Sequence, residues 1–227
     1  METHPEWLAA TWAYARPQLP PPPAAVLEVG CGPAGGLVPR LIADGYDAAG
    51  VDPEAPPGDS YHQVEFEQYQ PPRPVGAVIA VTSLHHVSRV GVVLDLARAA
   101  LRPGGTLVLI EWASERFDEP TARWSFGRLG SPGPGAGHGW LHRHRDQWAA
   151  SGQPWPDYLA GWLAGEGLHP GELILRETGA RFQEQTCHYG PYLFADLDAT
   201  SEQDEQAAID AGQIQATGIW YTGTAAL

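Results

Sequence analysis

The stretch VLEVGCGPAGG (residues 26–36) decides the fold that we expect for this 227-residue chain. Residues 24–30 are almost entirely apolar, which predicts a buried strand. The glycines that follow indicate a tight turn, because glycine is needed where the backbone turns sharply and lets a ligand approach closely. The stretch therefore predicts a site for a nucleotide-like ligand at the end of a buried strand.

The same alternation of apolar runs and helical patterns continues on the C-terminal side of this turn, up to residue 112. Strands are expected at 47–52, 61–66, 75–83 and 106–112, and helices at 35–45 and 89–101. Strands that alternate with crossover helices imply a doubly wound, mostly parallel α/β sheet.

Three further regions complete a single domain, which we divide around the core at 24–112. Residues 1–20 form an N-terminal lid helix (3–16) and a proline-rich linker, since proline cannot continue a helix. Residues 113–180 form a substrate cap or insertion, with helices at 145–151, 156–165 and 170–179. Residues 181–227 close the domain with an extended segment at 180–194, a helix at 201–215 capped by Ser201, and a strand at 217–225.

The composition limits the partners and the location of the protein. The 13 basic and 27 acidic residues give a net charge of −14, which argues against non-specific nucleic-acid binding. All basic residues are arginine, so no lysine can act as a Schiff base or nucleophile. With only Cys31 and Cys187, no signal-peptide pattern and no apolar run near 18 residues, we expect a cytoplasmic protein without a membrane partner.

The glycines alone leave two kinds of ligand open. Gly30, Gly32 and Gly35 can be read as G-x-G-x-x-G, the pattern of dinucleotide-binding turns. Glu28, two residues before the first glycine, argues against a dinucleotide as the ligand.

Further motifs follow the glycine turn in a set order. Asp52 ends the second strand about 20 residues later, and VEFEQY (64–69), AVTSLHHV (80–87) and LRPGGTLVLIEW (101–112) come next. Over residues 24–112 the chain resembles the class I S-adenosylmethionine-dependent methyltransferases. The resemblance implies a seven-stranded sheet with an antiparallel C-terminal strand, and a helical cap between the fifth and sixth strands.

The resemblance also implies S-adenosylmethionine as the cofactor and a set of residues that bind it. In this family an acidic residue two positions before the first glycine anchors the glycine turn. A second acidic residue, after the second strand, accepts hydrogen bonds from both ribose hydroxyls, and a third, near the third strand, accepts one from the adenine amino group. The implied cofactor-binding residues are Glu28, Gly30, Cys31, Gly32, Gly35, Asp52, Pro53, Glu65, Phe66, Thr82, Ser83 and Leu84. Glu67 is the alternative to Glu65.

Two departures from the family pattern lie near the ligand; a third, Gly76 or Ala77 where an acid is frequent, lies at the start of the fourth strand. Ala34 stands where a third alternating glycine is usual, and residues 53–60 contain three prolines where relatives carry a helix. We therefore expect a short loop, or the N-terminal helix, to cover the adenine edge. Trp12 and Tyr14 are the candidate lid residues, with simple packing as the alternative.

Three side chains are candidates for the chemistry beside the cofactor. His85 and His86 follow the fourth strand and Glu111 lies near the end of the fifth, where substrates of open α/β sheets bind. A histidine can remove a proton near neutral pH. The alternatives are packing for the histidines and a bond to a backbone amide for Glu111. The histidines of HGWLHRHRDQW (138–148) lack ligands at metal spacing, so no metal is expected.

These features predict a methyltransferase that acts on a small organic molecule, as a monomer or homodimer. One alternative is a macromolecular substrate, tRNA or protein, held by a basic face of arginines 116, 123, 128, 143 and 145. Another is a protein of this fold that binds the cofactor without transferring methyl groups.

Overall fold

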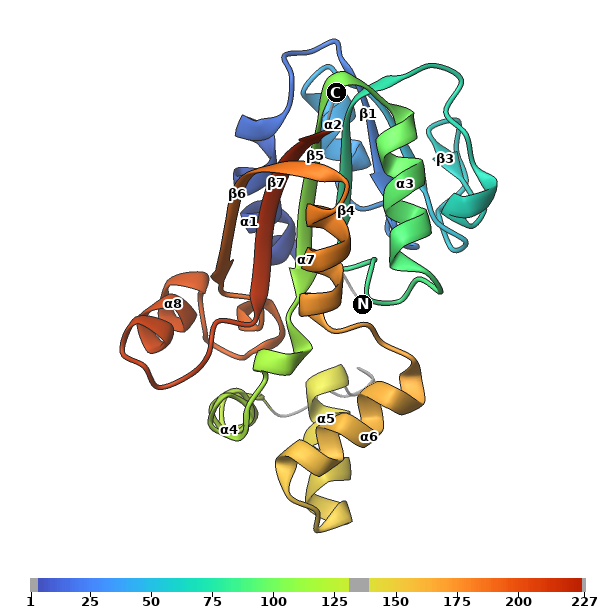
Figure 1. Ribbon diagram of the computed structural model, residues 1–227. Coiled ribbons are helices and arrows are strands. Elements are labelled where there is room, and N and C mark those ends of the chain that lie inside the picture. Colours follow the sequence, from blue (N-terminus) through green and yellow to red (C-terminus); the bar gives the residue numbers. More distant parts are fainter. Residues whose placement is uncertain (1–3, 131–138, 226–227) are drawn as a thin grey trace.

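The computed structural model describes residues 4–130 and 139–225, which form a central seven-stranded sheet (Figure 1). Its strands lie in the order β3-β2-β1-β4-β5-β7-β6. All neighbours from β3 to β5 are parallel, and β7 runs antiparallel to both β5 and β6. The strands are β1 (Ala25–Val29), β2 (Asp47–Val51), β3 (Tyr61–His62), β4 (Val75–Val81), β5 (Leu101–Trp112), β6 (Phe182–Gly190) and β7 (Gly218–Ala225). This confirms the predicted fold class.

Helices cover both faces of the sheet. The α-helices are α1 (Pro5–Ala15), α2 (Val38–Ala43), α3 (Val90–Ala100), α4 (Glu119–Phe126), α5 (Trp140–Ser151), α6 (Trp155–Glu166), α7 (Gly171–Gly179) and α8 (Glu202–Asp210). Short 3-10 helices are η1 (Arg16–Gln18), η2 (Phe66–Gln68), η3 (Ser114–Arg116) and η4 (Phe194–Asp196). One face packs against α1 and α2, and the other against α3 and α7.

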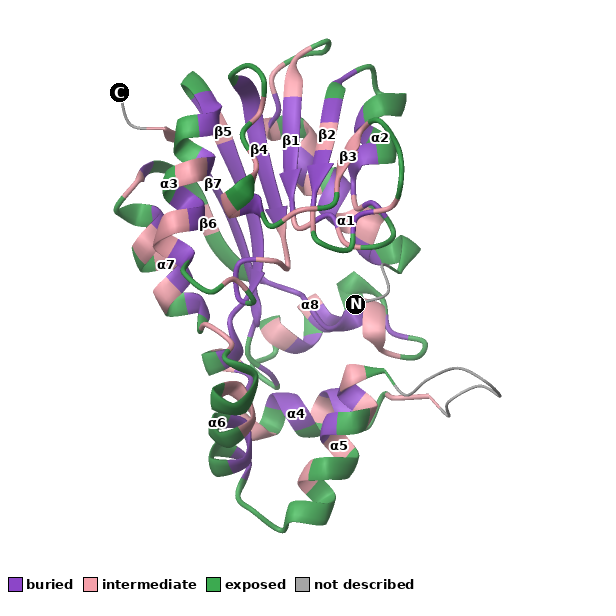
Figure 2. Ribbon diagram, turned by 90° about the vertical axis from the view of Figure 1, so that its right-hand side faces the viewer, coloured by how far each residue is buried: buried purple, intermediate pink, exposed green. Residues whose placement is uncertain are grey.

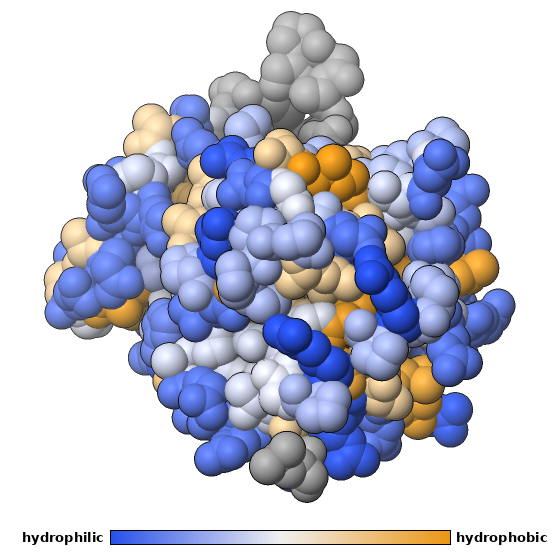
Figure 3. All heavy atoms as spheres, turned by 90° about the horizontal axis from the view of Figure 1, so that it is seen from above, coloured by the Kyte–Doolittle hydropathy of each residue, from blue (hydrophilic) through white to orange (hydrophobic). Residues whose placement is uncertain are grey.

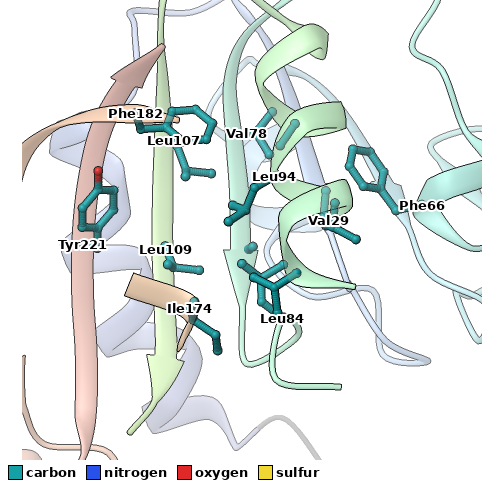
Figure 4. Close-up of a cluster of buried hydrophobic side chains, with 14 of the residues drawn as sticks. Val29, Phe66, Val78, Leu84, Leu94, Leu107, Leu109, Ile174, Phe182 and Tyr221 are labelled. Atoms are coloured by element: carbon teal, nitrogen blue, oxygen red, sulfur yellow. The ribbon is translucent and has the colours of Figure 1, made fainter. Parts of the chain in front are cut away.

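The two layers follow from the alternation of side chains along the strands. Along β4, Ala77 and Ile79 belong to the core under α1 and α2, whereas Val78 and Ala80 belong to the core under α3 and α7. Figure 4 shows the second core, with Leu94 of α3 pointing onto the sheet. Burying such a leucine stabilises the fold by about 1.5–3 kcal/mol. Strands buried on both faces need continuous apolar sequence, which explains the runs seen in the chain.

The insertion after β5 forms a helical lobe below the carboxyl ends of the parallel strands (Figures 1 and 2). Helices α4, α5 and α6 build it around aromatic side chains that are continuous with the core next to the sheet. Trp155 is buried there, and its indole N–H donates a hydrogen bond of 2.6 Å to the carbonyl of Phe117. Helix α7, which the sequence grouped with this cap, instead lies beside α3 on the sheet.

The opposite end of the molecule carries the amino ends of the parallel strands. Figure 3 shows this face as mostly hydrophilic, with apolar side chains in small separate groups. Among the described residues no helix is long and apolar enough to cross a membrane.

The predicted third strand and the predicted helix at 35–45 differ in extent from the structure. The third strand, expected to reach Phe66, stops at His62, because β2 ends at Val51 and Pro53 offers no N–H for further pairing. The helix expected at 35–45 is α2, which places Pro39 in its first turn, where proline is tolerated.

Helix α4 was not predicted, although its start is marked in the sequence. The side chain of Asp118 caps it by accepting the amide hydrogen of Thr121 at 2.9 Å, and Pro120 lies in the first turn. The predicted cap of the last helix is confirmed, since Ser201 and Asp204 form a reciprocal capping box at the start of α8.

Candidate functional site

A cavity of about 450 Å³ opens at the carboxyl edge of the parallel strands. Its floor is the glycine turn after β1 and the ends of β2 and β4. Helix α1 and the segment 192–196 close it from the other side. Ligands of open α/β sheets bind at this edge, next to the point where the strand order reverses.

The buried carboxyl group of Glu28 anchors the glycine turn. Its Oε2 accepts the amide hydrogen of Leu37 at 2.8 Å. Gly36 passes so close that a Cβ on it would collide with this carboxyl group, which explains why a glycine stands there. Burial raises the pKa of Glu28 to about 8, and the backbone bonds oppose that rise. A cationic ligand group beside Glu28 would favour its ionised form.

The turn itself needs glycine at Gly30, where φ is +78° and a Cβ would collide with the side chain of Ser83. Gly32 also has a positive φ, of +63°, but the space where its Cβ would lie is open. Cys31 between them is buried in the wall, and burial with the nearby carboxylates raises the pKa of its thiol to about 12. The thiol is therefore protonated at neutral pH and serves packing.

Asp52 links the ends of β1 and β2. Its Oδ2 accepts the amide hydrogen of Gly32 at 3.0 Å, and its Oδ1 accepts that of Glu54 at 2.7 Å. The carboxylate is half-buried and lines the cavity, so it retains lone pairs for hydroxyl donors.

Farther along this rim, Phe66 presents a buried ring between two acids. Glu65 is exposed and Glu67 half-buried, and both line the cavity. The two alternatives for the adenine amino group therefore stay open.

At the end of β4 the chain takes an unusual conformation. Thr82 has a φ of +50°, a strained value for a β-branched residue. The next residue, Ser83, donates its hydroxyl to the carbonyl of Val29 at 3.1 Å, which ties the end of β4 to the glycine turn.

The two histidines that follow have different surroundings. His85 is buried, and its Nδ1 lies 2.6 Å from Oε2 of Glu111. His86 lines the cavity, and its ring lies 4.1 Å from that of His85, measured between centroids. Although part of the ring faces solvent, desolvation and then the neighbouring His85 lower the pKa of His86. His86 is therefore neutral at pH 7 and can accept a proton.

The charge of the cavity decides between a dinucleotide and the alternative kind of ligand, which the glycines alone did not distinguish. Its described lining contains six carboxyl groups and no arginine: Glu28, Asp52, Glu54, Glu65, Glu67 and Asp196. A pyrophosphate would be repelled here, whereas a ligand with ammonium and sulfonium charges would be attracted. The carboxylates also offer acceptors for hydroxyl and amino groups. The residues present therefore fit S-adenosylmethionine.

Most of the predicted cofactor-binding residues line this cavity: Glu28, Gly30, Cys31, Gly32, Asp52, Pro53, Glu65, Phe66, Thr82 and Ser83. Gly35 and Leu84 do not. Gly35 lies under Tyr61, and Leu84 is part of the core under α3. Of the three candidate catalytic residues, only His86 reaches the cavity. His85 and Glu111 lie behind its wall, paired with each other.

Sequence reasoning proposed the N-terminal helix as a lid but did not identify the side chains of the wall opposite the glycine turn. Trp7, Leu8, Tyr192, Ala195 and Asp196 contribute to it. The proposed lid residues lie elsewhere: the indole of Trp12 belongs to the core over α2, and the ring of Tyr14 packs on Trp220. Helical spacing places Trp7 and Thr11 on one face of α1, but no local signal marks residues 192–196 as their neighbours.

The described residues contain no group of three or more side chains that could hold a metal ion. In the histidine-rich helix α5, Nδ1 of the buried His144 lies 2.7 Å from the hydroxyl of Tyr158.

The strand order, the acid-anchored glycine turn and the acidic cavity at the strand ends together define a class of protein, the Rossmann-like S-adenosylmethionine-dependent methyltransferases. Residues 5–151 match the methyltransferase-domain family, and the chain belongs to it. The protein is an S-adenosylmethionine-dependent methyltransferase. A search of curated proteins by sequence finds no match.

Solved structures share the fold at low sequence identity. The N-methyltransferase NodS from Bradyrhizobium japonicum, solved with S-adenosylhomocysteine, is 12% identical, covers 100% of this chain and 90% of its own, and has a TM-score of 0.54. A geranyl diphosphate methyltransferase is 17% identical, with coverage of 95% and 76% and a TM-score of 0.58. The 1,6-didemethyltoxoflavin-N1-methyltransferase from Burkholderia thailandensis is 14% identical, with coverage of 97% and 78% and a TM-score of 0.53.

Proposed function

We propose that the protein methylates a small organic molecule inside the cavity at the carboxyl edge of its sheet. The observation that carries this proposal is the closure of that cavity. Trp7 of α1 and Tyr192 come from opposite ends of the chain and cover the side facing the glycine turn. A volume of about 450 Å³ lies in the lower part of the range for small-molecule pockets, and cofactor and acceptor must share it.

The cofactor end of the cavity comprises the glycine turn and the loops after β2 and β3. We assign the methionine part to the turn around Gly30 and Gly32, the ribose hydroxyls to Asp52, and the adenine to Phe66 with Glu65 or Glu67. When bound, the cofactor supplies an electrophilic methyl group, so the protein has to align the acceptor and remove its proton.

His86 is the proton acceptor in this proposal. It is the predicted catalytic residue that lines the cavity, and its neutral form can take a proton from the acceptor. His85 and Glu111 act as positioning residues, because they hold the loop that carries His86.

A macromolecular substrate has less support in the cap. Arg123 pairs with Glu119, and Arg145 with Asp146. Arg116 donates to the carbonyl of Ala216 at 2.7 Å and lies over a tyrosine ring. These arginines are engaged within the protein, and no described residue of 113–180 lines the cavity. The geranyl diphosphate and didemethyltoxoflavin enzymes, which share the fold, are named for small-molecule substrates.

The test is an assay of S-adenosylhomocysteine formation with pools of small molecules, with bulk tRNA and with protein extract. We expect turnover in a small-molecule pool. Turnover with tRNA or protein alone would favour the macromolecular alternative. Tight cofactor binding by calorimetry without turnover in any pool would favour a cofactor-binding protein that transfers no methyl group.

We also propose a cytoplasmic location. Both cysteines, Cys31 and Cys187, are free thiols, as expected in a reducing compartment. Imaging of a fluorescent fusion at native expression would test the location.

A further inference from the structure

The wall opposite the glycine turn carries different kinds of side chain from the turn itself. The ligand that we infer for this wall rests on the function proposed above. We call this wall the acceptor end and define it by Trp7, Leu8, His86, Tyr192 and Asp196. It offers aromatic rings, one carboxyl group and one imidazole. No arginine lies in the described lining, and its only basic side chains are the imidazoles of His4 and His86, so the lining holds no permanent positive charge for a carboxylate or phosphate on the acceptor.

Two of these side chains form a rigid aromatic pair. The rings of Trp7 and Tyr192 meet edge to face, with centroids 5.1 Å apart and an interplanar angle of 75°. Trp7 also packs on Phe194 and Trp220, which fixes its position. The faces of indole and phenol rings attract cations, most strongly where water is excluded.

The segment that carries Tyr192 is fixed by a buried carboxyl group from α8. Glu205 accepts the amide hydrogens of Tyr192 at 2.9 Å, of Leu193 at 2.9 Å and of Phe194 at 2.6 Å. The wall is therefore built before any ligand arrives, which lowers the entropic cost of binding.

Asp196 supplies the negative charge of this end. Its Oδ2 accepts the indole hydrogen of Trp140 at 2.8 Å, and its Oδ1 lies 3.7 Å from Nε2 of His4. Oδ1 therefore has capacity left for a further donor. Burial raises the pKa of Asp196, so a cation that binds beside it would gain by restoring the ionised carboxylate.

We propose that the methyl acceptor is a small amine, bound as its ammonium ion between the Trp7–Tyr192 pair and Asp196. The ammonium gives one proton to His86, and the neutral nitrogen then forms a bond to the methyl carbon. The bond from that carbon to the sulfonium sulfur breaks, and its electron pair stays on sulfur. The product leaves as a methylammonium ion, and His86 returns its proton to water.

The experiment compares three pools of compounds built on the same aromatic and alkyl skeletons, as amines, alcohols and carboxylates. Formation of S-adenosylhomocysteine and the mass of the product are measured for each pool. We expect turnover in the amine pool at least tenfold above the other two. Turnover that is equal or greater with alcohols or carboxylates overturns the amine assignment and leaves the proposed function intact. Absence of turnover in all three pools overturns both.

A variant pair tests the role of Asp196. Asp196→Asn should raise KM for the best amine by about tenfold or more, with a smaller change in kcat, and Asp196→Glu should recover part of the loss. Asp198→Asn is the matched control, because Asp198 lies nearby, is exposed and does not line this cavity. Circular dichroism reports whether each variant is folded, and calorimetry then measures its affinity for S-adenosylhomocysteine. Weaker S-adenosylhomocysteine binding by a folded Asp196→Asn would place Asp196 at the cofactor and overturn the inference.

Discussion

Glu111 and His85 form a buried pair behind the cavity, with 2.6 Å between Oε2 of the carboxyl group and Nδ1 of the imidazole. The other oxygen of Glu111 accepts the amide hydrogens of Ser83, at 2.8 Å, and Leu84, at 2.5 Å. A single side chain of β5 therefore holds the loop after β4 and orients the residue before His86.

Replacing Glu111 should destabilise the whole domain. Glu111→Gln keeps the size of the side chain but removes its charge, and its N–H₂ group fits only if it faces His85 and the imidazole changes to the tautomer that accepts at Nδ1. We expect the free energy of unfolding in denaturant to fall by about 2–4 kcal/mol. Glu119→Gln, which breaks an exposed pair with Arg123, should cost less than about 1 kcal/mol. Equal losses in the two variants would show that the buried pair contributes no special stability.

The open space at Gly32 gives a test of the cofactor assignment. Gly32→Ala and Gly104→Ala both place a Cβ in open space at a positive φ, of +63° and +70°. Each should lose about 1 kcal/mol of stability because of the backbone strain. Only Gly32→Ala should weaken S-adenosylhomocysteine binding, by about tenfold or more in calorimetry, since its methyl group would enter the cavity. Unchanged affinity would place the cofactor away from this turn.

His86 should matter for the chemical step and little for cofactor binding. We expect His86→Gln to lower kcat by about 100-fold, the lower end for loss of a general base, with unchanged S-adenosylhomocysteine affinity. His188→Gln, at an exposed histidine of β6, is the control. Because desolvation lowers the pKa of His86, wild-type kcat should persist as the pH falls below 6.5 and decline only toward about pH 4. Full kcat in His86→Gln would exclude it as the proton acceptor.

The buried His144 should make the fold sensitive to acid. Burial, and then the charge of Arg143, lower the pKa of His144 to about 4 from an unfolded value of 6.5. Between these values the unfolded state binds the proton more readily, so stability is lost as the pH falls from 6.5 toward 4. The loss from this residue is at most roughly 3–4 kcal/mol, at about 1.36 kcal/mol per pKa unit. Denaturant unfolding at pH 7.5 and 4.5 should show a smaller acid loss in His144→Phe than in wild type. The same loss in both would assign the acid sensitivity to other groups.

Much of the cofactor end was predictable because its signals are local. The apolar run before Glu28, the glycines after it and Asp52 at the next strand end all lie within residues 24–52, and parallel strands bring their carboxyl ends to one edge. Gly35 and Leu84 were assigned to this end as well, yet they support it from outside the cavity.

The acceptor end could not be predicted in this way. Trp7 and Tyr192 meet only because α1 packs beside the segment between β6 and α8, and neither segment carries a pattern that names the other. The short length of β3 likewise follows from where β2 ends, which periodicity does not show.

The neighbouring histidines show most clearly which features the sequence determines and which ones the tertiary structure decides. Residue order places His85 and His86 together at the end of β4, and short-range periodicity and backbone geometry determine the sheet and the glycine turn. The class of cofactor is implied by the resemblance of the ordered motifs to a known family. Tertiary structure decides that His85 turns inward to Glu111 while His86 faces the cavity, because burial and hydrogen-bond partners come from strands distant in the chain. The same long-range packing of α1 against residues 192–196 makes the wall to which we assign the acceptor.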